Sequence, residues 1–555
     1  MTLPWRLRPR LPALRWHLAG GVLGLGLAAA SITVASPMLG TSPGDSAPAA
    51  PGSTTAPGTA TVGSPVAVPF AGNPELKARL DNPGILTIAG ERLNADLLRR
   101  FYGGHGYQTV WDTRQAQAGA LWALVMHAGS QGLDPDAFHA NVLSRQGANL
   151  SPVERDLLTT DAFLAYSDAL ARGGVPIEQR DDDEDLTPET VDVVAVLDAA
   201  LAGSNPAQPI EALAPNAPEY ATLRRAYAGY QAIAQAGGWP RIGESGRDGS
   251  RLQQLQQRLA AEGYLPAGYF SAAYDDTTVR AVRSFQEHHG LDVDGRLNPA
   301  TVTELNVPAD ARARQVAVNL ERLRWLPRAL PLDRVWVNAA NARLQLFRGG
   351  QVAFTTRVVV GEVDKQTPEF QADIVSVLFN PPWNVPYSIA SKEILPKLSA
   401  QPDYLSHHHM TIRGNGTVQQ EPGPGNALGQ LKFEMPNRYD VYLHDTPLKN
   451  LFSRDNRRIS HGCVRVENPR VLASLLLDQP LESINKGIAL VKTNRHMLPA
   501  ALPVFIVYQT AYADPDGSIQ FRRDFYERDD EIWQHLTRSP QMPVAQETTG
   551  SQRKG

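Results

Sequence analysis

The sequence of 555 residues contains a single cysteine, Cys463. One thiol excludes an intrachain disulfide, so no disulfide framework stabilises the fold. Basic residues are not in excess, because 53 Lys and Arg stand against 57 Asp and Glu, and no polybasic block occurs. The net charge of −4 therefore argues against a nucleic-acid partner. Charged residues make up only 20% of the chain and apolar residues 42%, which is enough for several buried cores.

The N-terminus carries positive residues followed by an uncharged apolar run. Arginines between residues 6 and 15 precede residues 18–35, LAGGVLGLGLAAASITVA. This pattern is typical of a signal peptide or a signal anchor, and the run is close to the roughly 20 residues that span a bilayer. Residues 33–35 make a weak cleavage site, so for residues 1–35 we favour a membrane anchor, with the arginines on the cytoplasmic side and the rest of the chain exported. In such an exported chain, Cys463 is a chance residue, an intermolecular bridge or a reactive thiol.

Three segments follow the N-terminal run. Residues 36–73 consist mostly of Ser, Pro, Ala, Gly and Thr with almost no charge, which predicts a flexible linker. Residues 74–240 carry apolar side chains at helical spacing and predict a helical scaffold domain without a catalytic cluster. Residues 245–308 predict a three-helix module, in which Asn298 caps the third helix and Pro299 takes its first position.

The last part of the chain has the period of strands. Alternating apolar residues predict a mostly-β domain over residues 330–512, and GIALVKTN at 487–494 continues the strand pattern. A stretch rich in Gly, Asn, Pro and His, at about 392–432, predicts a long irregular insertion that acts as a lid. We expect residues 513–540 to be helical and residues 541–555 to be disordered. The fold class is therefore α+β, with several domains.

The single cysteine lies in a segment that favours nucleophilic chemistry. Residues 460–466 read SHGCVRV, so His461 and Arg465 flank the thiol, and positive neighbours stabilise a thiolate. A cysteine nucleophile also needs a base, and the candidate is His444 in the strand-like segment VYLHDTP. Strand alternation places His444 on the polar face of its strand. The 19 residues from His444 to Cys463 suffice for a loop that returns the chain to the neighbouring strand.

Other residues of the same segment are candidates for supporting roles. We expect the backbone amides of Gly462 and Cys463 to form an oxyanion hole. Ser460 and His461 are expected to shape the site. Arg465 either anchors a substrate carboxylate or pairs with Glu467 on the same strand face, and the sequence leaves both open.

Three adjacent histidines, residues 407–409, raise the question of a zinc site. Adjacent side chains point in different directions, and no spaced motif of metal ligands accompanies them. We therefore expect no metal and no cofactor.

Two segments resemble known families. Residues 444–469, HDTPLKNLFSRDNRRISHGCVRVENP, are similar to the signature of L,D-transpeptidases: a histidine, a short spacer, then Ser-His-Gly-Cys-x-Arg. Residues 245–308 resemble the common peptidoglycan-binding module. The similarity spans about 80–535 and extends to the large periplasmic, membrane-anchored members, which have the order anchor, helical scaffold, peptidoglycan-binding module and catalytic β domain.

The resemblance implies a reaction and roles for the residues. The nucleophile would be Cys463, the base His444, and the group that orients the base the backbone carbonyl of Asp445. The thiolate would attack the carbonyl of diaminopimelate at position three of a tetrapeptide stem, D-alanine would leave, and an amine of a second stem would resolve the thioester into a 3→3 crosslink. The resemblance also implies peptidoglycan stem peptides and glycan as partners, and acylation by carbapenems.

Three alternatives stay open. With water as acceptor, the same site would be an L,D-carboxypeptidase, and with a lysine of an outer protein it would attach that protein to the wall. A non-catalytic peptidoglycan-binding scaffold is the third, and an intact SHGC with an upstream histidine argues against it.

Overall fold

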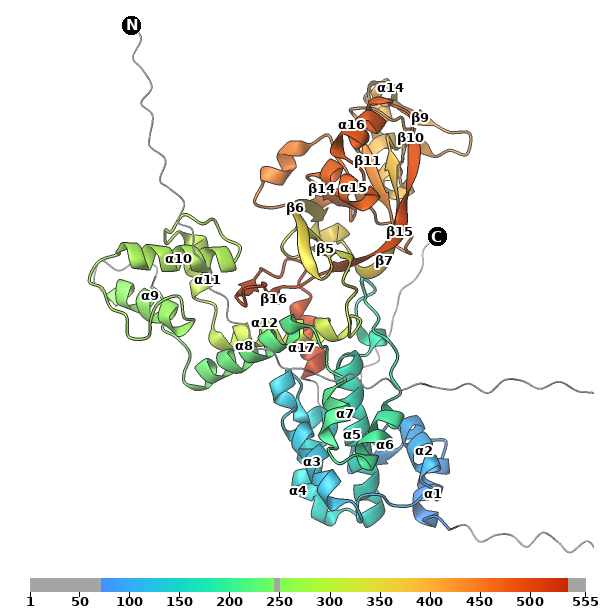
Figure 1. The fold of residues 1–555 in the computed structure, drawn as a ribbon, viewed down its shortest axis with the longest axis vertical. Helices are drawn as coiled ribbons and strands as arrows, with labels where there is room; N and C mark the ends of the chain where they lie inside the picture. The colour runs from blue at the N-terminus through green and yellow to red at the C-terminus, as the bar shows by residue number, and fades with distance from the viewer. Residues whose placement is uncertain (1–70, 244–249, 538–555) are drawn as a thin grey trace, which may run out of the picture. The chain divides into compact units, whose positions relative to one another are not determined.

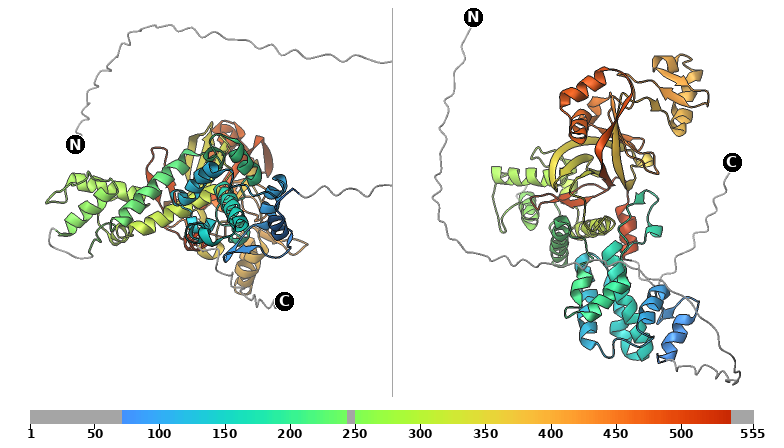
Figure 2. Two further views of the ribbon diagram at one scale, coloured as in Figure 1. Left: turned by 90° about the horizontal axis from the view of Figure 1, so that it is seen from below. Right: turned by 45° about the vertical axis from the view of Figure 1, so that its right-hand side comes forward.

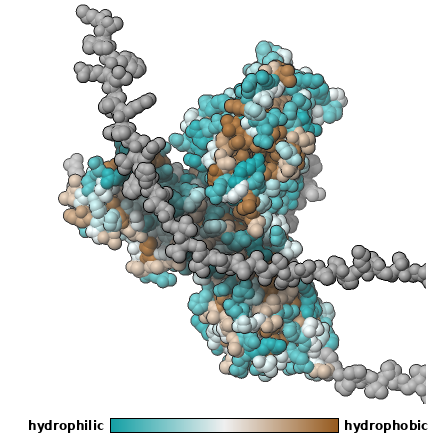
Figure 3. Space-filling model, viewed as in Figure 1, coloured by the Kyte–Doolittle hydropathy of each residue, from teal (hydrophilic) through white to brown (hydrophobic). Residues whose placement is uncertain are grey.

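The computed structural model describes residues 71–243 and 250–537. The predicted anchor, nearly all of the predicted linker and the predicted disordered tail lie outside these residues. Within the described ranges, no helix combines the length and the apolar character needed to cross a membrane. On the face shown in Figure 3, hydrophobic side chains appear in patches among hydrophilic ones.

The part of the chain before the module is helical, as its apolar spacing predicted (Figure 1). Its longest helix begins at a capping box, in which Ser151 and Glu154 each bind the other's backbone amide. A short hairpin, β1 (Thr87–Ile88) and β2 (Glu91–Arg92), accompanies the helices. The helices are α1 (Pro74–Asp81), α2 (Ala95–Gly104), α3 (Gln115–Met126), α4 (Ala140–Gln146), α5 (Pro152–Arg172), α6 (Val193–Ala202), α7 (Ala207–Glu211) and α8 (Pro218–Gln235).

A buried ionic group ties the hairpin of this domain to its longest helix. His139 lies between Asp161 on α5, at 2.8 Å, and Glu91 on β2, at 3.2 Å. All three side chains are buried. Because carboxylates and an imidazolium without partners would be unfavourable in this interior, the three groups depend on one another.

The module consists of α9 (Ser250–Ala261), α10 (Asp276–His288) and α11 (Pro299–Leu305) around a small apolar core. The predicted cap of the third helix is confirmed, since the Asn298 side chain accepts a hydrogen bond of 2.8 Å from the Thr301 amide and Pro299 follows it. Helix α12 (Ala309–Arg324) comes next. Its Glu321 accepts hydrogen bonds from the backbone amides of Gly174 and Val175, just after α5.

The mostly-β part forms one sheet, in the order β11-β12-β14-β6-β5-β4-β15-β7-β3. Strand β11 also pairs with β7, which closes the sheet into a ring, and β13 pairs with β6. The strands are β3 (Glu184–Asp185), β4 (Arg334–Asn338), β5 (Arg343–Arg348), β6 (Gln351–Gly361), β7 (Glu369–Phe379), β11 (Leu431–Glu434), β12 (Leu443–His444), β13 (Arg458–Ser460), β14 (Val464–Val466) and β15 (Asn494–Val507).

The two faces of the sheet have different surroundings. On β4, Val335 and Val337 belong to the core of the β domain, while Trp336 between them joins the core of the helical domain. Helices α15 (Pro469–Leu477) and α16 (Leu481–Ala489) contribute buried side chains to the first core. The strand expected at 487–494 is wrong, because α16 continues to Ala489 and β15 (Asn494–Val507) begins only at the last residue of that range. Ile484 and Ile488 are one helical turn apart and both buried, so the chain is helical there.

The predicted insertion is a small folded unit rather than an irregular loop (Figure 2). It begins before residue 392, with β8 (Trp383–Asn384), and its sheet has the order β8-β10-β9. The other strands and helices are β9 (Met410–Ile412), β10 (Val418–Gln420), α13 (Tyr387–Ile389) and α14 (Tyr404–His407). An apolar cluster that includes Val385, Ile394 and Met410 fills it. Short strands among Gly and Asn residues gave too little alternation to be predicted.

The segment after the sheet is helical only in part. Residues 513–540 were expected to be helical, but β16 (Ala511–Ala513) and β17 (Ile519–Phe521) form a hairpin, and between 513 and 537, where the structure describes the chain, only α17 (Asp529–Leu536) is a helix. The turn at Asp514 to Gly517 separates the two strands and ends on a glycine with a φ of +86°.

Candidate active site

Strand register brings the predicted nucleophile and base onto one face of the sheet. Strands β12 and β14 are parallel neighbours, with Leu443 opposite Val464 and His444 opposite Arg465. Directly opposed residues, and residues two apart on one strand, point to the same face. Cys463 precedes Arg465 by two residues, so it shares the outer face with His444, whereas Leu443 and Val464 are buried in the core.

The turn that presents the thiol is held by Ser460. The buried Ser460 hydroxyl donates a hydrogen bond of 2.7 Å to the Cys463 carbonyl and accepts one of 3.2 Å from the Gly462 amide. Gly462 has a φ of +105°, which a residue with a Cβ adopts only with strain. The structure therefore gives Ser460 and Gly462 a role in shaping the loop.

Two residues that sequence reasoning missed support the same turn. Thr367 donates a hydrogen bond of 2.7 Å to the Gly462 carbonyl and accepts one of 2.9 Å from the Gly361 amide. Tyr526 donates to the Gly361 carbonyl at 2.8 Å. Both are far from Cys463 in sequence and belong to no local motif, so only the fold reveals them.

The expected oxyanion hole is present only in part. Because the Gly462 amide already donates to Ser460, it is not free to stabilise an oxyanion. No acceptor for the Cys463 amide occurs among the residues that the structure describes. The prediction of two amide donors is therefore wrong for this conformation, and the Cys463 amide is the candidate donor.

The candidate base is buried, oriented and neutral. His444 is only 4% exposed, and its Nδ1 lies 2.5 Å from the carbonyl oxygen of Asp445. A carbonyl only accepts, so Nδ1 carries the proton and Nε2 is the basic nitrogen. Burial, and after it the charge of Arg465, lower the pKa of His444 to about 3 against the opposing effect of the Asp445 and Leu428 backbone. The Asp445 side chain is bound elsewhere, to the Gln430 amide and to Lys449.

The thiol is protonated in the resting site. Burial raises the pKa of Cys463, although Tyr442, Lys432 and Arg465 all act to lower it. The expectation that cationic neighbours produce a resting thiolate is therefore wrong. The resting pair consists of a thiol and a neutral imidazole.

Arg465 does not form the ion pair that was one of its two predicted roles. Glu467 instead pairs with Arg357, with 3.0 Å from Nε to the carboxylate. The Nε of Arg465 is buried and has no hydrogen-bond partner among the described residues. Burial lowers the pKa of Arg465, and a negative charge on Cys463 opposes that effect.

His461 links the cysteine loop to the insertion. Its Nε2 lies 2.6 Å from a carboxylate oxygen of Glu393, which also contacts Lys365 at 3.4 Å. The contact with His461, ahead of that with Lys365, holds the pKa of Glu393 below its usual value. His461 is exposed and engaged with the insertion, which fits a site-shaping role rather than that of a second base.

A cleft of about 1040 Å³ lies over the thiol. The insertion supplies one wall, which includes Trp383 and Glu393, and the chain around β11 supplies another. Cys463, Tyr442 and Lys432 line it, whereas His444 and Arg465 are not among its described lining residues. Lys432 was not predicted, because only the pairing of β11 with β12 places it opposite His444.

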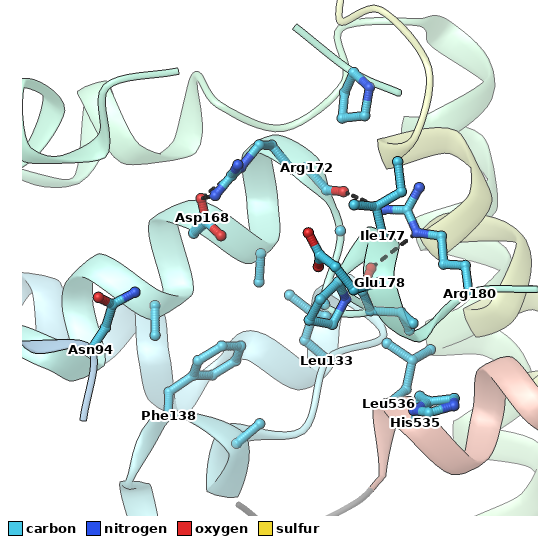
Figure 4. Close-up of a pocket in the computed structure, with 18 of the residues that line it drawn as sticks. Asn94, Leu133, Phe138, Asp168, Arg172, Ile177, Glu178, Arg180, His535 and Leu536 are labelled. Atoms are coloured by element: carbon cyan, nitrogen blue, oxygen red, sulfur yellow. Dashed lines mark hydrogen bonds and ion pairs between the residues drawn. The ribbon is translucent and has the colours of Figure 1, made fainter. Parts of the chain in front are cut away.

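A second cavity, of about 480 Å³, lies in the helical domain (Figure 4). Among its polar side chains, Arg172 pairs with Asp168, and Arg180 donates to the Arg172 carbonyl. Apolar side chains such as Leu133, Phe138 and Leu536 line the rest. This cavity contains no nucleophile with a base, so the cleft beside Cys463 is the candidate active site.

Two histidines of the run at 407–409 contact neighbouring residues of the insertion. His407 contacts Asp403, and the His408 ring packs against that of Tyr404 at a tilt of 39°. Within residues 71–243 and 250–537, no three His, Cys, Asp or Glu side chains are grouped so as to hold a metal ion.

Comparison with known families identifies the domain that carries this cleft. The L,D-transpeptidase catalytic domain matches residues 332–486, which include both His444 and Cys463. Residues 332–486 form an L,D-transpeptidase catalytic domain. A scaffold domain matches residues 96–226 and a peptidoglycan-binding domain residues 248–305. The predicted family and the predicted α+β organisation are thus confirmed.

Two curated proteins are similar to parts of the chain. A Haemophilus influenzae protein with the name "Putative L,D-transpeptidase" is 34% identical over 241 residues, which cover 39% of this chain and 48% of that protein. The chain thus matches about half the length of that relative. N-acetylmuramoyl-L-alanine amidase CwlL of Bacillus licheniformis is 41% identical over 59 residues, which are 10% of this chain and 16% of the amidase.

Solved structures of L,D-transpeptidases are also similar to the chain. One, from Xylanimonas cellulosilytica, has 18% identity and a TM-score of 0.18, and the match covers 48% of this chain and 97% of that one. A TM-score of 0.18 is too low to support an inference about the fold of the transpeptidase domain.

Proposed function

We propose that this protein is an L,D-transpeptidase that forms 3→3 peptidoglycan crosslinks by cysteine acyl transfer. The observation that carries the proposal is the placement of Cys463 and His444 on one face of two neighbouring parallel strands, under a cleft in an L,D-transpeptidase catalytic domain. Nucleophile and base on adjacent strands, with the base oriented by a third group, are the arrangement that covalent acyl transfer needs.

The first step starts from the neutral pair. As Sγ of Cys463 attacks the carbonyl of diaminopimelate in the donor stem, its proton passes to Nε2 of His444. The Asp445 carbonyl stabilises the imidazolium through Nδ1–H. Lys432 and Arg465, whose charges lower the pKa of the thiol, stabilise the negative sulfur as it forms.

The second step releases the end of the donor stem. The Cys463 amide donates to the oxygen of the tetrahedral intermediate. The imidazolium of His444 then gives its proton to the departing nitrogen of D-alanine, and the thioester with Cys463 remains.

The third step transfers the acyl group. A side-chain amine of diaminopimelate in a second stem attacks the thioester, His444 accepts the proton of the amine, and the thiol leaves with that proton. With water in place of the amine, the product would be a tripeptide, and the enzyme would be a carboxypeptidase. With a lysine of an outer protein, the product would be a wall-attached protein.

The other domains fit action on the cell wall. The module at 248–305 matches a peptidoglycan-binding domain and would hold the chain to glycan or stem peptides. We place the enzyme in the periplasm, anchored in the inner membrane by the apolar run near the N-terminus.

Intact-mass spectrometry with a carbapenem tests the proposal. The unmodified protein should gain the mass of one carbapenem, and Cys463→Ala should gain none. Because the chain has no other cysteine, the adduct can be assigned without peptide mapping. His444→Ala should form the same adduct about 100-fold more slowly, since it lacks the base. An adduct that persists in Cys463→Ala would contradict the assignment of the nucleophile.

A further inference from the structure

Lys432 is a cation on the wall of the cleft beside the thiol. It lines the same cavity as Cys463 and Tyr442. Its position opposite His444 on β12 puts its side chain on the face that carries the thiol. Because neighbouring strands are about 4.8 Å apart, the backbones of Lys432 and Arg465 lie roughly 10 Å apart across β12. Cys463 is two residues from Arg465 along its strand, so its backbone lies roughly 12 Å from that of Lys432.

The ammonium is held over an aromatic ring next to the thiol. Nζ of Lys432 lies 3.9 Å from the centre of the Tyr442 ring. Tyr442 adjoins the cysteine, since its carbonyl accepts a hydrogen bond of 3.1 Å from the Val464 amide. A cation–π contact of this kind fixes a flexible side chain without neutralising its charge.

Lys432 has no acidic partner among the residues that the structure describes. Glu434, two residues along the same face, is engaged with Arg495 at 2.6 and 3.0 Å and with the Ser376 hydroxyl at 2.5 Å. Burial lowers the pKa of Lys432, against the opposing effect of Glu434. A half-buried ammonium without an anion beside it is unfavourable, and an anionic ligand would relieve this.

The other cations near the thiol are less suited to bind a substrate anion. Lys365 is paired with Glu362 at 3.0 Å and with Glu393. Lys392 is exposed to water on the insertion. Arg465 is not among the described residues that line the cleft.

We propose that Lys432 binds the terminal carboxylate of the acyl donor and thereby selects stems with one residue beyond the bond that is cut. The inference rests on the proposed function and adds the specificity of the donor site. In a tetrapeptide, the carboxylate of the last residue lies about 4 Å from the carbonyl that reacts, one residue away. In a pentapeptide it lies about 7 Å away. A cation fixed beside the thiol distinguishes the two lengths.

Equilibrium binding to Cys463→Ala protein tests this without turnover. The probes are a disaccharide-tetrapeptide with a free terminal carboxylate and the same compound as its terminal carboxamide. Each is titrated into three further variants in the Cys463→Ala background: Lys432→Met, Lys432→Arg and Lys392→Met. Lys392→Met is the control, because it removes a lysine charge from an exposed position of the same cleft. Melting temperatures check that each variant is folded.

Cys463→Ala protein should bind the free acid at least about 30-fold more tightly than the terminal carboxamide, because the carboxamide cannot form a buried charge pair with Lys432. Lys432→Met should bind the two equally, while Lys432→Arg and Lys392→Met should keep the preference. An unchanged preference in Lys432→Met would overturn the inference, and so would absence of binding by both probes. A separate assay tests the proposed function itself: if it is wrong, the unmodified protein will release no D-alanine from the tetrapeptide.

Discussion

The Nδ1 atom of His444 donates a hydrogen bond of 2.5 Å to the backbone carbonyl of Asp445, the residue that follows it. This contact fixes one tautomer without placing a charge beside the ring. The imidazole is therefore a neutral, oriented base on the same face of the sheet as a protonated thiol, and that thiol donates to the Asp440 carbonyl at 3.9 Å. The site differs in this respect from a thiolate–imidazolium pair, and the difference can be tested through pH.

The buried neutral state of His444 predicts that stability falls on the acid side. In the unfolded chain, histidine binds a proton with a pKa of about 6.5, whereas in the fold the pKa of His444 is lowered to about 3. Between these values the unfolded chain holds more protons, so the free energy of unfolding decreases as pH falls. At pH 5 the loss is about 2 kcal/mol.

Denaturant unfolding at pH 7.5 and pH 5.0 measures this loss, with His444→Gln as the comparison. The variant has no titrating group at this position, so its stability should drop less between the two pH values. An equal drop in both proteins would show that His444 does not carry this pH dependence.

Thr367→Val should lower the rate of acyl transfer while the protein stays folded. The substitution removes the hydroxyl that holds the Gly462 carbonyl but keeps the shape of the side chain. We expect kcat to fall by about 10-fold, because a small displacement of the nucleophile is costly to the reaction. Thr367→Ser restores the hydroxyl and should restore most of the rate. Equal rates in Thr367→Val and the unmodified protein would exclude a positioning role.

Glu393→Gln should weaken substrate binding more than chemistry. It removes the charge that joins His461 of the cysteine loop to the insertion wall of the cleft. We expect KM to rise by about 3- to 10-fold with kcat nearly unchanged, since an exposed contact of a carboxylate with a polar side chain contributes roughly 1 kcal/mol. Glu362→Gln, which removes a carboxylate that contacts Lys365 but not His461, is the matched control. A KM effect of the same size in both would mean that only the net charge of the cleft matters.

His139→Leu should destabilise the helical domain by about 3 kcal/mol or more, because it removes the cation that lies between the buried carboxylates of Glu91 and Asp161. Burial alone would lower the pKa of His139, but the hydrogen bonds to the two carboxylates raise it to about 9. The stabilising proton is thus bound below pH 9, and the contribution is lost as pH rises through that value. Thermal melting at pH 7 measures the effect. Turnover per folded molecule well below the melting temperature should not change, and a matching loss of turnover would place His139 in the active site.

The local parts of the site could be predicted from the sequence. The SHGC segment, the upstream His444 and the cap at Asn298 are short-range patterns, in which neighbouring residues determine one another's conformation. Strand alternation around His444 was enough to assign it to an outer face. These patterns do not depend on how distant strands pair.

The non-local parts could not be predicted. Thr367 and Tyr526 reach the cysteine loop only through tertiary contacts, and Lys432 lies beside the site only because β11 pairs with β12. The state of the thiol was predicted wrongly for a related reason. The flanking charges are visible in the sequence, but the burial that outweighs them is not.

The most direct test of the account is mass spectrometry of the products formed from disaccharide-tetrapeptide by residues 71–555, with Cys463→Ala alongside. The account predicts a dimer of two stems joined by a 3→3 bond and lacking one D-alanine, together with free D-alanine, and neither product with Cys463→Ala. Tripeptide and D-alanine without dimer would show hydrolysis in place of crosslinking. Unchanged substrate, or equal products from both proteins, would contradict the central claim that Cys463 carries the acyl group.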